Sequence, residues 1–259
     1  MCTMNDPVTT PDTRGIRLNI VFDNYPCNPG LQSLWGFACL IEMAGQTVLF
    51  DTGSNGRVLL QNMEQMCLDP ASVEMLFVSH PHWDHIGGLD SVIELAPHLE
   101  IVAPDSLSKL YLRDLRGAVR KLSVIDGMPT KIGVNLYSTG VMGEIGEQAL
   151  VIDTEEGLIV ITGCAHPGID MIVARAQEML GKDILLLMGG FHLSESDNDA
   201  MEGLVVSLKS HGVQRLCPTH CTGDLARKMF AESFGALYLA GGAGMKVDFG
   251  SSVHSAAGI

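Results

Sequence analysis

Residues 78–88 read Val-Ser-His-Pro-His-Trp-Asp-His-Ile-Gly-Gly. Three imidazoles and one carboxylate therefore lie within six residues, at His80, His82, Asp84 and His85. They follow the apolar run 73–79, which is suited to a buried strand. Imidazole and carboxylate are ligands for zinc, iron and manganese, and a turn assembled for packing alone rarely collects so many of them. We therefore predict a metal site directly after this strand.

The pattern His-x-His-x-Asp-His after a strand resembles the signature of the metallo-β-lactamase superfamily. The resemblance implies that His80 and His82 hold one metal, and that Asp84 and His85 hold a second. A finer resemblance covers about residues 16–245 and points to the branch named after 7,8-dihydropterin-6-methyl-4-(β-D-ribofuranosyl)aminobenzene-5′-phosphate synthase. Most members of that branch are called metal-dependent hydrolases. The finer resemblance is carried by residues 23–24, 49–53, 147–150, 163–168, 189–192 and 218–223.

The same resemblance implies that two later histidines complete the two sites. His166 follows a predicted strand and would complete the first site, whereas His220 follows another and would complete the second. Many members of the superfamily carry a metal-bridging Asp after the next strand, but this chain has Gly189 and Gly190 there. Two ions without a shared carboxylate repel each other more strongly. The second site is therefore expected to be weaker, differently populated or supported by His192.

Further side chains are candidates for supporting roles. Asp84 would also orient the attacking water, and His192 would contact the substrate or the solvent at the metals, with direct ligation and simple packing as alternatives. Asp51 would accept a hydrogen bond from a ligating imidazole, or it starts an ordinary turn. Asn24 would reach the pocket from the end of the first strand, or it too belongs to a turn. Cys164, two residues before a predicted ligand, is a candidate for contact with the site.

The remaining histidines and one cysteine have simpler interpretations. His98 stands at a helix end, His211 in a last helical turn and His254 in a small-residue tail, so none of them is expected in the site. Cys221 is adjacent to His220. On an extended chain adjacent side chains point in opposite directions, so Cys221 is expected to pack rather than to bind metal.

Strands and helices are expected to alternate along the chain. Alternating or short apolar runs predict strands at 16–22, 37–42, 47–50, 73–79, 101–103, 134–138, 148–154, 158–162, 184–188 and 216–218, with a hairpin turn at 44–46. Helical spacing predicts helices at 57–68, 90–95, 106–120, 169–180, 199–211 and 225–234. Strand runs in both halves, interleaved with helices, indicate the α/β class and a four-layer αββα sandwich. Because no linker-like segment interrupts the 259 residues, we expect one domain preceded by a polar arm at 1–15.

The composition restricts the possible partners. Sixteen basic and thirty acidic residues give a net charge of −14, which repels nucleic-acid backbones and anionic lipids. Some enzymes with a similar motif are nucleases, but those need a basic track. We therefore expect a small-molecule substrate, with neither nucleic acid nor a membrane as partner, and the oligomeric state stays open. The seven scattered cysteines and the lack of a secretory signal indicate a cytoplasmic protein.

These features together predict a metal-dependent hydrolase. A divalent ion lowers the pKa of bound water from ~15.7 to ~7, so hydroxide at neutral pH would attack an ester-type bond of a small molecule. A phosphodiester, ester, lactone or thioester would suit this chemistry. One or two zinc ions are expected, with iron or manganese as alternatives. Two other functions stay open: an iron-dependent oxidoreductase acting on oxygen or sulfur compounds, and a catalytically silent metal-binding regulatory protein.

Overall fold

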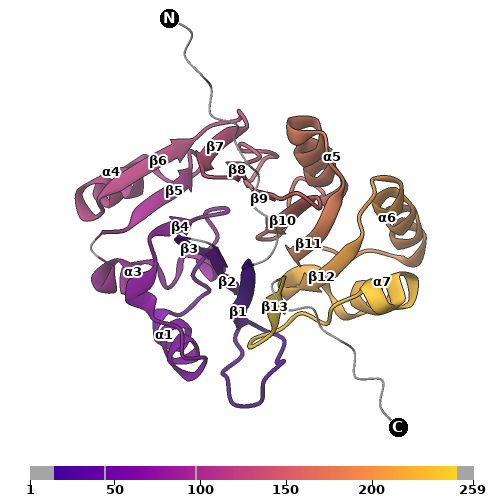
Figure 1. Ribbon diagram of the computed structural model, residues 1–259, viewed down its shortest axis with the longest axis horizontal. Coiled ribbons are helices and arrows are strands. Elements are labelled where there is room, and N and C mark those ends of the chain that lie inside the picture. The colour runs from indigo at the N-terminus through magenta and orange to yellow at the C-terminus, as the bar shows by residue number, and fades with distance from the viewer. Residues whose placement is uncertain (1–14, 44, 97, 250–259) are drawn as a thin grey trace, which may run out of the picture.

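Two β-sheets pack face to face, and helices cover the outer face of each (Figure 1). The computed structural model describes residues 15–43, 45–96 and 98–249. The predicted α/β class and four-layer sandwich are confirmed. The polar arm up to residue 14, Ala44 of the predicted hairpin turn and His254 lie outside the described residues.

The first sheet brings the ends of several strands to one edge. Because β1 and β3 are both antiparallel to β2, they run in the same direction, and β4, β5 and β6 are parallel to β3. The residues that follow β1, β3 and β4 therefore meet at one edge of the sheet. In the order β13-β1-β2-β3-β4-β5-β6, its strands are β1 Arg17–Asp23, β2 Phe37–Met43, β3 Gln46–Phe50, β4 Met75–Phe77, β5 Glu100–Pro104, β6 Lys121–Ile125 and β13 Lys246–Asp248.

The second sheet has the order β12-β11-β10-β9-β8-β7. Strands β10, β11 and β12 are parallel neighbours, so the residues that follow them also meet at one edge. Strand β11 lies between β10 and β12. The strands are β7 Thr130–Gly133, β8 Leu136–Ser138, β9 Leu150–Asp153, β10 Leu158–Thr162, β11 Ile184–Gly190 and β12 Arg215–Thr219.

Three hydrophobic clusters fill the spaces between the four layers. The middle cluster joins the two sheets and contains residues such as Phe50 and Ile161. A second cluster packs α1, α3 and α4 onto the first sheet, and a third packs α5, α6 and α7 onto the second sheet. The helices are α1 Gly56–Gln65, α2 Trp83–Ile86, α3 Leu89–Leu95, α4 Lys109–Ala118, α5 Ile169–Leu180, α6 Asn198–Ser210 and α7 Asp224–Phe234. Short 3-10 turns lie at Pro70–Ser72, His220–Thr222 and Gly235–Leu237.

Several predicted boundaries were wrong. The predicted helix 106–120 ends earlier, at Ala118, and the chain then enters the edge strand β6, which the sequence pattern did not reveal. The predicted strand 134–138 is the second arm of a hairpin, β7–β8, which turns at Asn135 with a φ of 58°. Strand β13 was also missed, because it has only three residues and pairs with the distant strand β1.

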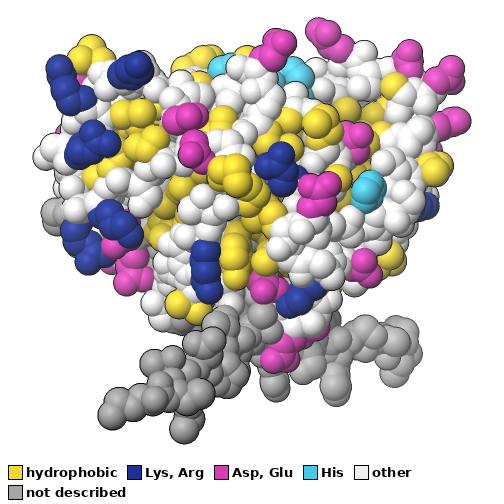
Figure 2. All heavy atoms as spheres, turned by 90° about the horizontal axis from the view of Figure 1, so that it is seen from above, with side chains coloured by type: hydrophobic (Ala, Val, Ile, Leu, Met, Phe, Trp, Pro, Cys, Tyr) yellow, Lys and Arg dark blue, Asp and Glu magenta, His cyan; other side chains and the backbone are white. Residues whose placement is uncertain are grey.

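The surface carries mixed charge on the face shown in Figure 2. Lys and Arg side chains gather at one side of this face, over α4 and β6. The exposed basic residues of α4, of β6 and of the segment between them are called the basic patch below; they are Lys109, Arg113, Arg116, Arg120 and Lys121. No helix in the described part of the chain has the length and apolar character that crossing a membrane requires.

Candidate metal centre

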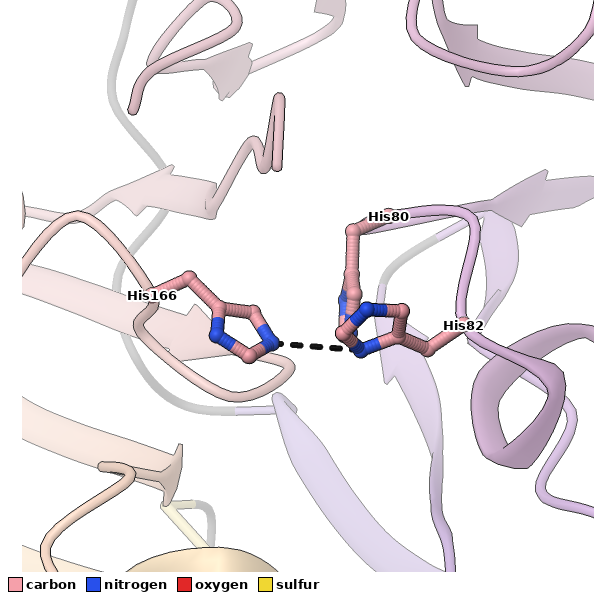
Figure 3. Close-up of side chains that lie close together, drawn as sticks. All are labelled: His80, His82 and His166. Carbon is pink, nitrogen blue, oxygen red and sulfur yellow. Dashed lines mark hydrogen bonds between the residues drawn. The ribbon is translucent and has the colours of Figure 1, made fainter. Parts of the chain in front are cut away.

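Three histidines converge across the two halves of the sandwich. His80 and His82 follow β4 of the first sheet, and His166 follows β10 of the second (Figure 3). His82 Nδ1 lies 3.1 Å from His80 Nε2 and 3.3 Å from His166 Nε2. His80 is buried, whereas the other two side chains are half-buried and border the solvent. The three nitrogen atoms therefore form a cluster that is open on one side.

A second group lies directly beside the first and contains Asp84, His85 and His220, all buried. Asp84 Oδ2 lies 3.3 Å from His220 Nε2 and 3.8 Å from His85 Nε2. Residues 83–86 form the one-turn helix α2, which carries Asp84 and His85. The turn is anchored because Thr52 donates both its backbone N–H and its hydroxyl to the His85 carbonyl, at 2.8 and 2.9 Å.

Asp51 fixes the orientation of two imidazoles. Its Oδ2 accepts hydrogen bonds from His85 Nδ1 at 2.7 Å and from the Ser79 hydroxyl at 2.6 Å. Since the Ser79 hydroxyl donates to Asp51, it accepts from His80 Nδ1 at 2.8 Å. Both imidazoles thus carry their proton on Nδ1 and present the lone pair of Nε2 to the cluster. This is the role expected for Asp51, whereas the part played by Ser79 was not foreseen.

Asn24 orients the third buried imidazole. Its Oδ1 accepts a hydrogen bond from His220 Nδ1 at 2.8 Å, and its amide donates to the His220 carbonyl at 3.3 Å. His220 Nε2 is buried and, among the described residues, has no hydrogen-bond partner. A buried polar atom without a partner is costly. A cation beside Asp84 would satisfy it, so the residues of this group fit a bound metal ion.

The imidazoles of the first group are held neutral. Burial keeps the pKa of His80 well below its usual value, and the nearby imidazoles lower it further. Burial also lowers the pKa of His166 to about 4, with His192 and His82 adding to the effect. At neutral pH these rings therefore present lone pairs to one another. Such lone pairs repel unless a proton or a cation lies between them, so this group also fits a metal ion.

Glu147 holds the loop that carries His166, and the sequence reasoning gave it no role. Its Oε1 accepts hydrogen bonds from the backbone N–H groups of residues 163, 164 and 165 at 3.1, 2.9 and 2.9 Å. Its Oε2 accepts from the His166 N–H at 2.8 Å. One buried carboxylate thus organises the whole turn after β10.

Two cysteines and His192 form a third group beside the histidines. Cys164 Sγ lies 3.2 Å from His85 Nε2. The sulfur atoms of Cys164 and Cys221 and a ring nitrogen of His192 lie within 4.8 Å of one another. The prediction that Cys221 points away was wrong, because residues 220–222 form a 3-10 turn instead of an extended chain. Both thiols therefore face the site.

His192 lies at the exposed side of the centre. Its ring centroid is 4.5 Å from that of His166. The hydrogen bond with Cys221 raises the pKa of His192 above its ordinary value, although partial burial opposes this. Its backbone φ is 51°, and Asp51, Ala165 and His220 are also left-handed, with φ of 54°, 58° and 50°. Such conformations are uncommon outside glycine and gather at functional sites.

The other histidines lie outside these groups. His98 is exposed, and His211 Nδ1 bonds the Gln177 side chain at 2.8 Å, which ties α6 to α5. None of the ligand groups found among the described residues includes either side chain.

Comparison with protein families gives one match. The family model of the Metallo-beta-lactamase superfamily matches residues 36–174, which is more than half of the chain. A relative from Methanocaldococcus jannaschii is 28% identical over 256 residues, which cover 80% of this chain and 87% of the relative. That relative is named 7,8-dihydropterin-6-methyl-4-(beta-D-ribofuranosyl)-aminobenzene-5'-phosphate synthase.

Solved structures show the same architecture. A metal-dependent hydrolase of the beta-lactamase superfamily is 29% identical, has a TM-score of 0.74 and covers 90% of this chain and 98% of its own. The metallo-beta-lactamase fold protein YhfI from Bacillus subtilis has a TM-score of 0.66 at 15% identity, over 90% of this chain and 99% of its own. The second likeness concerns the fold alone.

Proposed function

Because the chain belongs to the metallo-beta-lactamase superfamily, we propose that it is a metal-dependent hydrolase of an ester-type bond in a small molecule. The bond is a phosphodiester, ester, lactone or thioester. The observation that carries the proposal is the pair of adjacent ligand groups, one of three imidazoles and one of two imidazoles with a carboxylate. A hydrolase of the same superfamily, 29% identical over nine-tenths of the chain, supports it.

The proposed ligands divide between two ions. His80, His82 and His166 hold the first, and Asp84, His85 and His220 hold the second. Zinc suits this donor set best, with iron and manganese as alternatives. When bound, such ions lower the pKa of water and polarise the oxygen of the bond under attack.

The protein itself supplies orientation. Asp51 acts on His85 directly and on His80 through Ser79, and Asn24 acts on His220, so that each Nε2 faces the cluster. Hydrogen bonds of this kind fix the tautomer and the direction of a ligating imidazole. Asp84 accepts a proton or hydrogen bond from the attacking water. We therefore describe Asp51, Ser79 and Asn24 as positioning residues.

His192 is the proposed proton donor to the leaving group. It is exposed at the open side of the centre, next to His166, where a substrate would enter. A protonated imidazole at this position can donate its proton to a leaving group. As the water oxygen bonds to the carbon or phosphorus atom and the ester bond breaks, this proton moves to the departing oxygen or sulfur.

One relative is named as a synthase, so the activity assay should use a broader panel of substrates. Beside the centre, the half-exposed ring of Trp35 lies 4.9 Å from the His220 ring, and it offers a flat surface to an aromatic group. The panel should therefore include aromatic esters and phosphodiesters. An oxygen-uptake assay with a thiol substrate tests the alternative oxidoreductase.

The proposal is tested by metal content and activity together. The purified protein should contain one to two equivalents of zinc, iron or manganese by mass spectrometry, because two ligand groups are present. His82→Ala and His166→Ala should each lose metal and lower kcat/KM by about 100-fold or more, since each removes a ligand. His98→Ala, at an exposed position, is the matched control and should change neither.

His192→Gln separates the remaining roles. It should keep the metal and lower kcat by about 100-fold, as expected for loss of a general acid. Loss of one metal equivalent instead would make His192 a ligand. Metal-free, folded and fully active protein, or equal effects of all three alanine variants, would overturn the proposed function.

A further inference from the structure

Two buried sulfur atoms lie among the proposed metal ligands. Cys164 is 3% exposed and Cys221 is 5% exposed. Cys164 Sγ, His80 and His85 present ligand atoms within 4.8 Å of one another, although the two histidines belong to different ligand groups. The Cys164 sulfur therefore lies between the two groups. Cys221 Sγ approaches it from the loop after β12.

The proposed ligands carry less negative charge than two divalent ions would carry positive charge. Two divalent ions bring four positive charges, but the six proposed ligands include only one carboxylate, Asp84. Asp51 and Glu147, two other buried carboxylates nearby, hold parts of the protein instead: Asp51 accepts hydrogen bonds from Ser79 and His85, and Glu147 accepts four from the backbone. Burying uncompensated charge is expensive. With two thiolates, the ligand set itself would carry three negative charges instead of one.

The backbone of β11 preserves the space that one sulfur occupies. A Cβ atom added at Gly190 would lie 2.4 Å from the Gly163 carbonyl oxygen, 2.7 Å from Cys221 Sγ and 3.2 Å from His220 Cδ2. A side chain at position 190 and the thiol of Cys221 therefore compete for the same volume. Glycine at position 190 therefore leaves room both for the Gly163 carbonyl oxygen and for the Cys221 sulfur.

We propose that Cys164 and Cys221 are sulfur ligands of the metal centre, with the Cys164 sulfur lying between the two ligand groups. The proposal rests on the metal centre of the proposed function. As each sulfur–metal bond forms, the thiol releases its proton to solvent. A centre with two thiolates prefers thiophilic ions such as zinc, cobalt and cadmium over manganese and magnesium.

The test is the absorption spectrum of the full-length protein after its metal is removed with a chelator and replaced by Co²⁺. Thiolate ligation produces a sulfur-to-cobalt charge-transfer band in the near ultraviolet, which cobalt bound by nitrogen and oxygen lacks. We expect this band in the parent protein. Cys164→Ser and Cys221→Ser should each reduce it by about half, since each removes one of two thiolates, and the double variant should abolish it.

Matched controls separate ligation from other effects. Cys27→Ser and Cys67→Ser change exposed thiols and should leave the band intact. Circular dichroism and the visible cobalt bands report whether each variant is folded and still binds cobalt. Stoichiometric cobalt binding without a charge-transfer band would overturn the sulfur ligands and leave the proposed function standing. Failure to bind cobalt at all would overturn the metal centre itself.

Discussion

At the scale of single residues, Asp23 is a buried carboxylate that the fold accommodates at a cost. It ends β1 and is fully buried. It accepts a hydrogen bond from the Tyr25 N–H at 2.8 Å and another from the Thr219 hydroxyl. Burial raises the pKa of Asp23 from 3.8 to about 6, because the charged form loses water, and the hydrogen bond from Thr219 offsets this only in part.

The raised pKa predicts a specific pH dependence of stability. A folded-state pKa above the unfolded value favours the protonated folded form, so this contribution is present below pH 3.8 and is lost as the pH rises through about 6. A shift of about two pKa units corresponds to about 3 kcal/mol. Asp23→Asn cannot ionise, so its free energy of unfolding should rise relative to the parent by about that amount between pH 4 and pH 7.

Urea unfolding of both proteins at several pH values measures this difference. The exposed Asp105→Asn serves as the control and should show a nearly constant offset. An offset for Asp23→Asn that does not change between pH 4 and pH 7 would contradict the expected shift.

Candidate site residues could be predicted where the local sequence pattern alone indicates their role. The set at positions 80–85 was identified from spacing. Because each ends a strand, Asp51 was expected to accept a hydrogen bond from an imidazole and Asn24 to reach the pocket. Glu147 and Ser79 were missed, since their roles depend on partners that the fold brings together: Glu147 holds a loop that begins 16 residues later in the chain. Cys221 was misplaced because periodicity on an extended chain does not apply inside a 3-10 turn.

At the scale of elements, Asn62 connects helix α1 to the loop that carries Trp35. Its side chain is fully buried. It donates hydrogen bonds to the Val21 and Gln32 carbonyls at 2.9 Å each and accepts one from the Gln32 N–H at 2.9 Å. Three backbone groups of β1 and the following loop therefore depend on one amide.

Asn62→Ala should lower the free energy of unfolding by about 3 kcal/mol, because it leaves these backbone groups without partners and opens a small cavity. Gln61 precedes Asn62 on helix α1, and Gln61→Ala removes a single side-chain hydrogen bond with Gln32. This variant should lower the free energy of unfolding by less than about 1 kcal/mol. Chemical denaturation of both variants gives the comparison. Equal costs for the two would show that the buried amide does not hold the loop.

Helices with a clear apolar periodicity were predicted from the sequence. The strands β6 and β13, which are short and lie at the edges of the first sheet, were not. The helix predicted at 169–180 matches α5 at both ends, and α7 begins one residue before its predicted start. Strand β13 escaped because three residues carry too little periodicity, and its position is determined by β1 more than 200 residues earlier. Strand β6 escaped because its side chains are mostly exposed or half-buried, so no apolar run marks it.

At the scale of the whole molecule, the site exists only because the two sheets meet. The first group of histidines draws two members from the first sheet and one from the second (Figure 3). The second group is divided in the same way, with Asp84 and His85 after β4 and His220 after β12. The alternation of strands and helices predicted the layers, but no local pattern states which strand ends face each other. The resemblance to a known family supplied that information in advance.

The charge distribution bears on nucleic acid as a possible partner. The net charge of −14 opposes a polyanion, and the basic patch over α4 and β6 is the one gathering of cations visible on the described face in Figure 2. That patch is partly neutralised. Arg113 pairs with Asp114 at 2.8 Å, and Arg120 and Lys121 both pair with Glu100, at 2.5 and 3.3 Å.

We therefore expect no measurable binding of duplex DNA or RNA at physiological salt, because few counterions would be released on contact. Fluorescence anisotropy with labelled duplexes, measured from low to physiological salt, provides the test. Glu100→Gln together with Asp114→Asn removes the two carboxylates that neutralise the basic patch, so this variant should show at most weak binding that disappears as salt is added. Sub-micromolar, salt-dependent binding by the parent protein at physiological salt would contradict the prediction. It would then make the basic patch the first surface to mutate.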